Sequence, residues 1–225
     1  MKTNKEITIP TTQNEITLKQ YQDIQIFMDS ETDDMKIGVK MITTLCDITE
    51  EEVRGISKAD FDSIIETLLQ TLNKKSVWQQ RFKIGNVTYG FIPNIDDMTL
   101  GEYIDLDNVI NEPHALHKVM TILYRPITHE SFGRYDIAKY TGKEDTEIML
   151  QAPLDAVNGA FVFFYHLGNA LLKAMPHYLQ KVQKEIIASN QLSAKDGDGI
   201  VRSMELQMET LTSLIEQLNI VFIKP

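Results

Sequence analysis

Residues 89–107 restrict the fold most, because YGFIPNIDDMTLGEYIDLD contains a strand end, a proline stop and a helix start. Phe91 closes an apolar run, and Pro93 removes the next backbone donor, so a strand ladder ends there. Thr99 and Glu102 then form an S/T-x-x-E capping box, in which each side chain satisfies the orphan backbone N–H of the other residue. The segment therefore predicts a strand followed by a capped helix.

The rest of the sequence predicts mostly helices. Apolar residues at helical spacing, each preceded by a capping signal, predict helices at about residues 17–28, 33–46, 49–55 and 57–72. Two apolar runs joined by Gly85-Asn86 predict a β-hairpin over residues 77–92, and residues 135–140 favour one edge strand. Later helices are expected at residues 112–123, at 154–190 with a kink at Pro176, and from residue 200 onward.

These elements predict a mainly α (α+β) fold: a helical bundle with a small antiparallel β-hairpin and a separate C-terminal amphipathic helix. The predicted division is an N-terminal helical region (1–75), a hairpin with a helical core (76–190), and a linker with the last helix (191–225). The alternative is that all three regions form one domain.

Charge and cysteine content exclude several classes of protein. The formal charge of −10 argues against general affinity for nucleic acid or anionic lipid, both of which need a basic surface. The basic segment 73–83 favours a hairpin strand that balances acidic helices, with an acidic partner or nucleic acid as the alternative. Cys46 is the single cysteine, which suits a reducing cytoplasm, and we expect it in the core. No signal peptide or membrane span is expected.

Candidate metal and catalytic residues are few. His114 and His117 share a helical face, but a metal site would need further ligands such as His129 or Asp105, so surface histidines are the favoured interpretation. His166 in an apolar run is expected to be a core histidine rather than a catalytic base. The sequence contains no phosphate-binding glycine loop and no nucleophile elbow. We therefore expect neither a cofactor nor an enzyme.

Residues 194–206 resemble an EF-hand calcium loop. Asp196, Asp198 and Glu205 stand at ligand positions, and Gly199 stands at the sharp turn. Ala194 occupies the position of the first carboxylate ligand, and there is no second loop to pair with this one. A polar linker before a helix explains the same residues, so a weak calcium-binding interaction module is only an alternative prediction.

Four stretches carry a resemblance to a known group of proteins: residues 16–22, 89–107, 117–127 and 161–172. Together they are similar to proteins of the structural gene modules of tailed double-stranded-DNA bacteriophages, with the crass-like phages of gut bacteria as the nearest group. The resemblance extends over about residues 6–180 and carries no active-site residues. It implies a virion or assembly protein that acts in symmetric copies at the portal, neck or tail.

The resemblance leads us to expect a non-enzymatic structural protein of the virion, present in the host cytoplasm before assembly. It would form a ring, collar or portal-proximal component at the head–tail junction, with phage structural proteins and copies of itself as partners, and no membrane. The alternative is a tail-assembly chaperone or scaffold that is absent from the mature particle. The predicted interface residues lie in the hairpin, the central helix and the C-terminal helix: Trp78, Phe82, Phe91, Tyr103, Met204, Met208 and Leu211.

Overall fold

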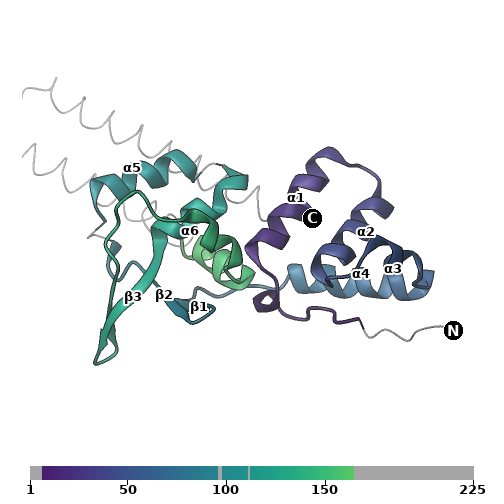
Figure 1. Cartoon of the computed structure of the whole chain (residues 1–225), viewed down its shortest axis with the longest axis horizontal. Helices are drawn as coiled ribbons and strands as arrows, with labels where there is room; N and C mark the ends of the chain where they lie inside the picture. The colour runs from purple at the N-terminus through teal and green to yellow at the C-terminus, as the bar shows by residue number, and fades with distance from the viewer. Residues whose placement is uncertain (1–6, 96–97, 111, 165–225) are drawn as a thin grey trace, which may run out of the picture. The chain divides into compact units, whose positions relative to one another are not determined.

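The computed structural model describes residues 7–95, 98–110 and 112–164 (Figure 1). The chain divides into two compact units, Met1–Gly159 and Ala160–Pro225, and nearly all described residues belong to the first. The fold is mainly helical with a small four-stranded antiparallel sheet, which confirms the predicted class. The predicted division into three regions stays a prediction, and the predicted C-terminal helix lies outside the described residues.

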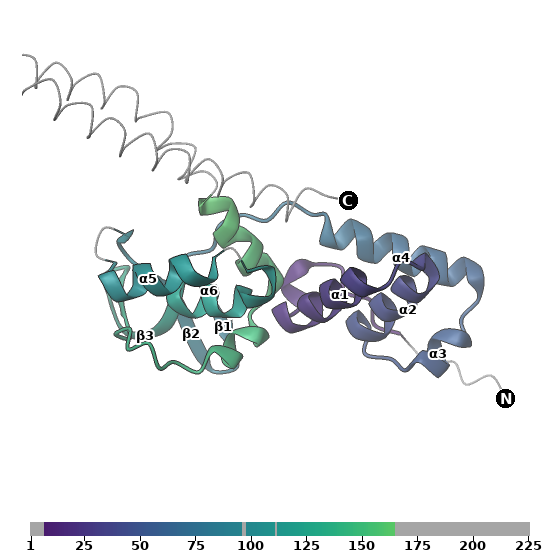
Figure 2. The ribbon, with the colours of Figure 1, turned by 90° about the horizontal axis from the view of Figure 1, so that it is seen from above.

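Helices fill the N-terminal part of the first unit (Figure 2). A polar side chain caps the start of each α-helix there. The side chain of Thr17 accepts a hydrogen bond from the backbone N–H of Gln20, and Asp33, Thr49 and Ser57 cap the next helices in the same manner. The four predicted helices are confirmed. They are α1 (Leu18–Ser30), α2 (Asp34–Leu45), α3 (Glu50–Arg54) and α4 (Lys58–Leu72), and the short 3-10 turn η1 (Gln13–Glu15) precedes them.

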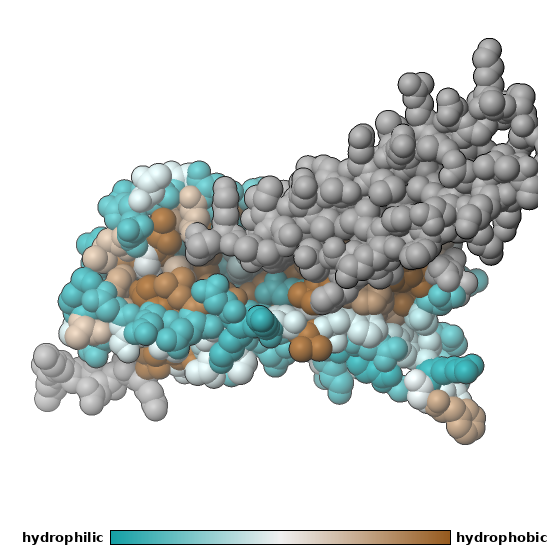
Figure 3. Space-filling model, turned by 180° about the vertical axis from the view of Figure 1, so that it is seen from behind, coloured by the Kyte–Doolittle hydropathy of each residue, from teal (hydrophilic) through white to brown (hydrophobic). Residues whose placement is uncertain are grey.

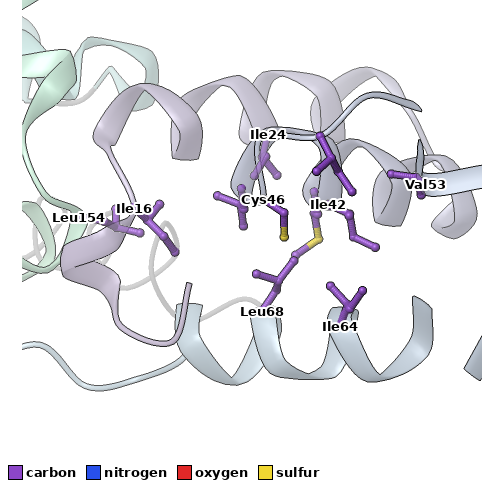
Figure 4. Packing of buried hydrophobic residues seen from close by; sticks show 11 residues of the cluster. Ile16, Ile24, Ile42, Cys46, Val53, Ile64, Leu68 and Leu154 are labelled. Carbon is purple, nitrogen blue, oxygen red and sulfur yellow. The ribbon is translucent and has the colours of Figure 1, made fainter. Parts of the chain in front are cut away.

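An apolar core lies between α1, α2 and α4 (Figure 4). Ile42 of α2 and Leu68 of α4 are fully buried, and Ile24 of α1 points toward them. Cys46, at the end of α2, is buried in the same cluster, and burial raises the pKa of its thiol. Cys46 is therefore a core residue that stays protonated at neutral pH, as the sequence predicted.

The sheet has the strand order β1-β2-β3-β4, with every neighbouring pair antiparallel. The predicted hairpin is confirmed as β1 (Arg81–Ile84) and β2 (Val87–Phe91). Gly85 supplies the positive φ of +55° that the turn between them requires. The predicted edge strand is β4 (Arg134–Ile137), which begins one residue earlier and ends three residues earlier than expected.

Strand β3 (Tyr124–Ser131) was not predicted from the sequence, where the helix at residues 112–123 was expected to end before Arg125-Pro126 and no strand was expected to follow it directly. Proline has no backbone N–H to donate to a neighbouring strand, so Pro126 argues against a strand assignment at this position. Here its carbonyl accepts a hydrogen bond from the backbone N–H of Ala138 (2.9 Å), and the pairing with β4 is irregular between Ile127 and His129. The proline is tolerated next to this irregularity.

Aromatic side chains from neighbouring strands pack together at the sheet. The ring of Tyr124 lies 4.9 Å from that of Phe82 and 5.1 Å from that of Phe91, and Trp78 meets Phe91 edge to face at 5.6 Å. The hydroxyl of Tyr124 donates a hydrogen bond to the carbonyl of Gln79 (2.7 Å). These rings form the core at the sheet.

The remaining elements lie either between β2 and β3 or after β4 in the chain. They are α5 (Leu100–Val109), the 3-10 turn η3 (Pro113–Ala115), α6 (Leu116–Leu123), the 3-10 turn η4 (Thr146–Gln151) and a helix described over residues 154–164. Around Pro153 the chain returns to the N-terminal segment, because Leu18 donates a backbone hydrogen bond to Ala152 (2.9 Å) and Leu154 donates one to Ile16 (2.8 Å). The start of α1 and the start of the last described helix are thus joined through the backbone.

Gly90 on β2 provides a test of the sheet packing. A Cβ atom at this position would lie 2.4 Å from Cε2 of Tyr135, whose hydroxyl donates to the carbonyl of Phe91 (2.8 Å). We expect Gly90→Ala to lower the free energy of unfolding by about 1–3 kcal/mol, because the tyrosine must move. Gly101→Ala is the control, since no atom lies closer than 4.0 Å to its Cβ; it should raise stability by up to about 1 kcal/mol. Equal denaturation midpoints for the two variants would contradict this packing.

Candidate interaction surfaces

Helix α5 turns large apolar side chains toward solvent. Leu100, Tyr103 and Ile104 are 74%, 59% and 49% exposed, and their i, i+3, i+4 spacing makes them neighbours on the helix. The side of α5 that faces the protein carries Glu102 and Leu106, which are buried. The three apolar residues therefore form one face, hereafter the outer face of α5, which lies at the surface.

A buried ion pair holds α5 against β3. Glu102 completes the predicted capping box with Thr99, whose backbone N–H donates to Oε2 of Glu102 (2.6 Å), and Oε1 accepts a hydrogen bond from Nη1 of Arg125. Both side chains are at most 8% exposed. Burial alone would raise the pKa of Glu102, but the hydrogen bonds from Thr99 and the charge of Arg125 outweigh it and lower that pKa.

Tyr140 adds a second attachment of α5. Its hydroxyl donates a hydrogen bond to Oδ2 of Asp105 (2.7 Å), and its ring centroid lies 5.8 Å from the guanidinium carbon of Arg125. Burial, followed by the hydrogen bond and charge of Asp105, raises the pKa of Tyr140 far above its ordinary value. The hydroxyl therefore stays a donor at any physiological pH, and α5 presents its outer face from a fixed position.

A second surface is the arm formed by the distal part of β3 and by β4 (residues 127–137). Strand β3 pairs with β2 only at residues 124–126, and its remaining residues pair with β4 alone. Figure 1 shows this hairpin extending beyond β1 and β2. One residue pair before its tip, Arg81 donates to Glu130 (2.8 Å), and the guanidinium carbon of Arg81 lies 5.1 Å from the ring centroid of Tyr135.

The tip of the arm is a two-residue turn with an unusual residue in it. Ser131 pairs with Arg134, which leaves Phe132 and Gly133 as the turn, with φ values of 50° and 78°. Turns of this kind favour asparagine, aspartate or glycine at the first position. A bulky side chain in the left-handed region costs about 1–2 kcal/mol. Phe132 nevertheless stands there and is fully exposed, at 104%.

A third surface is a groove of about 910 Å³ that is lined by residues of α1, α2, α3, α4 and the segments between them, hereafter the α1–α4 groove. Its apolar lining comprises Phe27, Met35, Val39, Ile48, Val53, Ile56 and Phe61. Met35, in the first turn of α2, is 49% exposed. The space-filling view in Figure 3 shows how apolar side chains (brown) reach the surface between hydrophilic ones (teal) on one side of the molecule.

The structure separates the predicted interface residues into different classes. Tyr103 is at the surface, where a partner can reach it. Phe82 and Phe91 are only 6% and 2% exposed, so the structure assigns their side chains to the aromatic core rather than to a surface. Trp78 is partly buried against Phe91. Met204, Met208 and Leu211, the calcium-loop residues Asp196, Asp198 and Glu205, and His166 all lie outside the described residues.

His114 and His117, the two candidate metal ligands, face different carboxylates. Nε2 of His114 lies 3.4 Å from Oδ2 of Asp29, and Nε2 of His117 lies 4.0 Å from Oε1 of Glu147. In the part of the chain that the structure describes, no group of three or more His, Cys, Asp or Glu side chains could hold a metal ion. Over the same residues, no helix has both the length and the apolar character needed to cross a bilayer.

His117 makes stability depend on pH. Burial lowers its pKa below the ordinary value of 6.5, and Nδ1 has no hydrogen-bond partner among the described residues. Because the pKa of His117 is lower in the folded protein, the unfolded chain binds the proton more tightly. The contribution of His117 to stability is therefore complete above pH 6.5 and falls as the pH drops below it. We expect His117→Gln to flatten the fall in melting temperature between about pH 7 and pH 5. An unchanged slope would contradict this role.

Phe132 and the α1–α4 groove were not predicted from the sequence. The signal for Phe132 was present, since Phe-Gly stands between two short extended segments where Asn-Gly is usual. The groove joins residues from several helices, and helical spacing does not show which apolar residues remain uncovered.

No family model matches this chain, and neither a curated protein nor a solved structure matches it.

Proposed function

We propose that this chain is a non-enzymatic structural protein of a tailed-bacteriophage particle that assembles in several copies at the head–tail junction. The observation that carries the proposal is the outer face of α5. This helix lies in one of the four stretches that resemble phage structural proteins, and it presents Leu100, Tyr103 and Ile104 to solvent. Adjacent exposed apolar side chains of this size are typical of protein–protein interfaces, in which tyrosine is enriched.

The attachment of α5 suits such a role. The Glu102–Arg125 pair and the Tyr140–Asp105 hydrogen bond fix the helix before any partner arrives. A surface that is already ordered loses little conformational entropy on binding. In a ring of identical copies each contact can be weak, because the closed assembly engages many contacts together. The formal charge of −10 keeps free subunits soluble until they assemble.

The first experiment is quantitative mass spectrometry of density-purified particles from the producing phage. The proposal expects peptides of this chain at a fixed ratio to the major capsid protein, corresponding to about a dozen copies or a small multiple of that number, because a closed symmetric ring contains a fixed number of subunits. Absence from the particle, together with abundant peptides in the infected lysate, would overturn the proposal.

Absence from the particle would favour a chaperone or scaffold, and one observation supports this candidate. Met28 and Met35 both expose their flexible side chains, at 44% and 49%. Methionine adapts to partners of different shape, as a transient assembly factor requires. The two functions differ in whether the protein remains in the finished particle, so the same measurement distinguishes them.

A pair of variants tests the α5 face itself. Tyr103→Glu places a charge in the centre of the exposed apolar face and should reduce incorporation into particles by roughly tenfold or more. Val77→Glu is the matched control, because Val77 is an exposed apolar residue outside α5 and the change in charge is identical. Both variants should unfold at the wild-type midpoint. Equal incorporation of the two variants would show that the outer face of α5 is not the contact.

A further inference from the structure

We propose that an extended apolar segment of a different protein covers the outer face of α5, where it pairs with the backbone of residues 98–100 and packs on Leu100 and Tyr103. The inference rests on the proposed function, because it uses the same face of α5, and it names the kind of segment that binds there. Its basis is a second site at the start of α1, where an extended segment of this chain is already bound.

The start of α1 and the start of α5 have the same sequence pattern. Residues 9–21 read IP-x6-TL-x2-Y, and residues 92–103 read IP-x5-TL-x2-Y, so the two patterns differ by one residue in the spacer. Thr17 and Thr99 are both extended N-caps of capping boxes, with φ and ψ of −86° and 155° at Thr17 and of −72° and 158° at Thr99. The two segments, hereafter the α1 repeat and the α5 repeat, therefore begin their helices with the same local geometry.

In the α1 repeat an extended segment of the same chain covers the start of the helix. Residues 152–154 lie antiparallel to residues 16–18, with an isolated β-bridge at the centre. The N–H of Leu18 and the carbonyl of Ile16 both form backbone hydrogen bonds with this segment, at 2.9 and 2.8 Å. Figure 4 shows Leu154 beside Ile16, and both Ile16 and Leu18 are buried. The start of α1 is thus closed by pairing with an extended segment.

In the α5 repeat the corresponding groups are open. The N–H of Leu100 and the carbonyl of Met98 have no backbone hydrogen-bond partner among the described residues. Leu100 and Tyr103 are exposed, whereas their counterparts Leu18 and Tyr21 are buried and partly buried. Within the described part of the chain, the α5 repeat is therefore an uncovered version of the site that is covered at α1.

The covered site defines the chemistry of the segment that the open site accepts. An extended backbone supplies a carbonyl for the N–H of Leu100 and an N–H for the carbonyl of Met98, as when a peptide strand adds to an open edge. At α1 the segment reads Ala-Pro-Leu, and proline fits its middle position because the two hydrogen bonds use only its neighbours. We therefore expect an apolar-proline-apolar segment, whose side chains remove Leu100 and Tyr103 from water.

A second copy of this chain is a poor source of the segment. Its own residues 152–154 are bound at the α1 repeat, where Ala152 and Leu154 are 0% and 1% exposed. Lending them would open this site and uncover Ile16 and Leu18, which are core residues. This cost favours a different protein as the source, and self-association through α5 is an outcome that the test detects.

The test uses the full-length chain, isotope-labelled for nuclear magnetic resonance, and a peptide with the sequence of residues 149–154 (MLQAPL), blocked at both ends so that it carries no charge. We expect saturable shifts of the amide signals of residues 98–103 and slower hydrogen exchange of the Leu100 amide. The Leu18 amide should not respond, because its site is already filled. Without peptide, the Leu100 amide should exchange much faster than the Leu18 amide.

Two substitutions of one residue separate the backbone pairing from the apolar contact. Leu100→Ala and Leu100→Pro both remove the leucine side chain, but only proline removes the N–H. Leu100 is the first residue of α5, where proline is favoured, and Thr99 before it already has the extended backbone that proline requires. We expect Leu100→Pro to bind the peptide roughly three- to tenfold more weakly than Leu100→Ala. Leu69→Ala, at an exposed apolar residue of α4, is the control and should bind like the wild type.

Absence of peptide-induced shifts, or equal affinities of Leu100→Pro and Leu100→Ala, would overturn the inference. Protection of the Leu100 amide in the monomeric chain without peptide would also overturn it, because a segment of the same chain would then cover the face. Self-association in sedimentation velocity runs that Leu100→Ala weakens would show that a second copy is the occupant, against the inference. None of these results depends on whether the protein is present in the phage particle, so a failure here is distinct from a failure of the proposed function.

Discussion

Replacing Arg125 by methionine is expected to lower the free energy of unfolding by about 3–5 kcal/mol, because it leaves the buried carboxylate of Glu102 without its cation. The pair connects the first turn of α5 to β3, and both side chains are almost inaccessible to water. Chemical denaturation at neutral pH, followed by circular dichroism, measures the effect. A loss below about 1 kcal/mol would show that the pair is solvated and of little value.

A double variant separates the charge from the packing. In Glu102→Gln/Arg125→Met no charge is buried, and the glutamine keeps the capping box with Thr99. It should recover most of the stability that Arg125→Met loses. The same pair predicts acid sensitivity. The pKa of Glu102 is lowered from its ordinary value of 4.5, so its contribution is present above that pH and is lost as the pH falls below it.

Gln13→Leu is expected to destabilise the protein by about 2–4 kcal/mol, because the buried amide of Gln13 joins parts of the chain that are far apart in sequence. Its Nε2 donates to the carbonyls of Thr71, Leu72 and Lys74 at 3.3, 2.8 and 2.9 Å. Its Oε1 accepts from Ser76 Oγ and Asn158 Nδ2 at 2.5 and 3.0 Å. Leucine fills a similar volume and leaves these groups without their partner.

Gln70→Leu is the matched control for this substitution. Gln70 is exposed on α4 and has one side-chain hydrogen bond, to Oε1 of Glu66 (3.2 Å). Its replacement should change stability by less than about 0.5 kcal/mol. Both variants replace a glutamine by leucine, so they differ in how deeply the glutamine is buried and in how many hydrogen-bond partners it has. Similar unfolding free energies for the two variants would contradict the role assigned to Gln13.

Local signals in the sequence were sufficient for most helices. The caps at Thr17, Thr49, Ser57 and Thr99 depend on residues within three positions, so the letters alone identify the start of each helix. The hairpin of β1 and β2 could be predicted for the same reason, since its turn and its two strands are adjacent in the chain.

Information about distant contacts was not available from the sequence. Alternating residues show that a strand has two faces but not which face is covered, and Phe82 and Phe91 were therefore expected at an interface although they lie in the core. The partners of Gln13 lie between 58 and 145 positions away, beyond any local pattern. Strand β3 was missed because its pairing tolerates Pro126, a tolerance that depends on the irregular register beside it.

The junction between α6 and β3 has a mechanical consequence. Leu123 is the last residue of the helix and Tyr124 the first of the strand, so no loop separates them. A pull on the tip of the arm runs along β3 and loads its hydrogen bonds with β2 in shear, where they resist together instead of opening one after another. Bending is then concentrated at the irregular register between Ile127 and His129. The arm therefore has one bendable point, and its base is attached both to α6 through the backbone and to β2 through strand pairing.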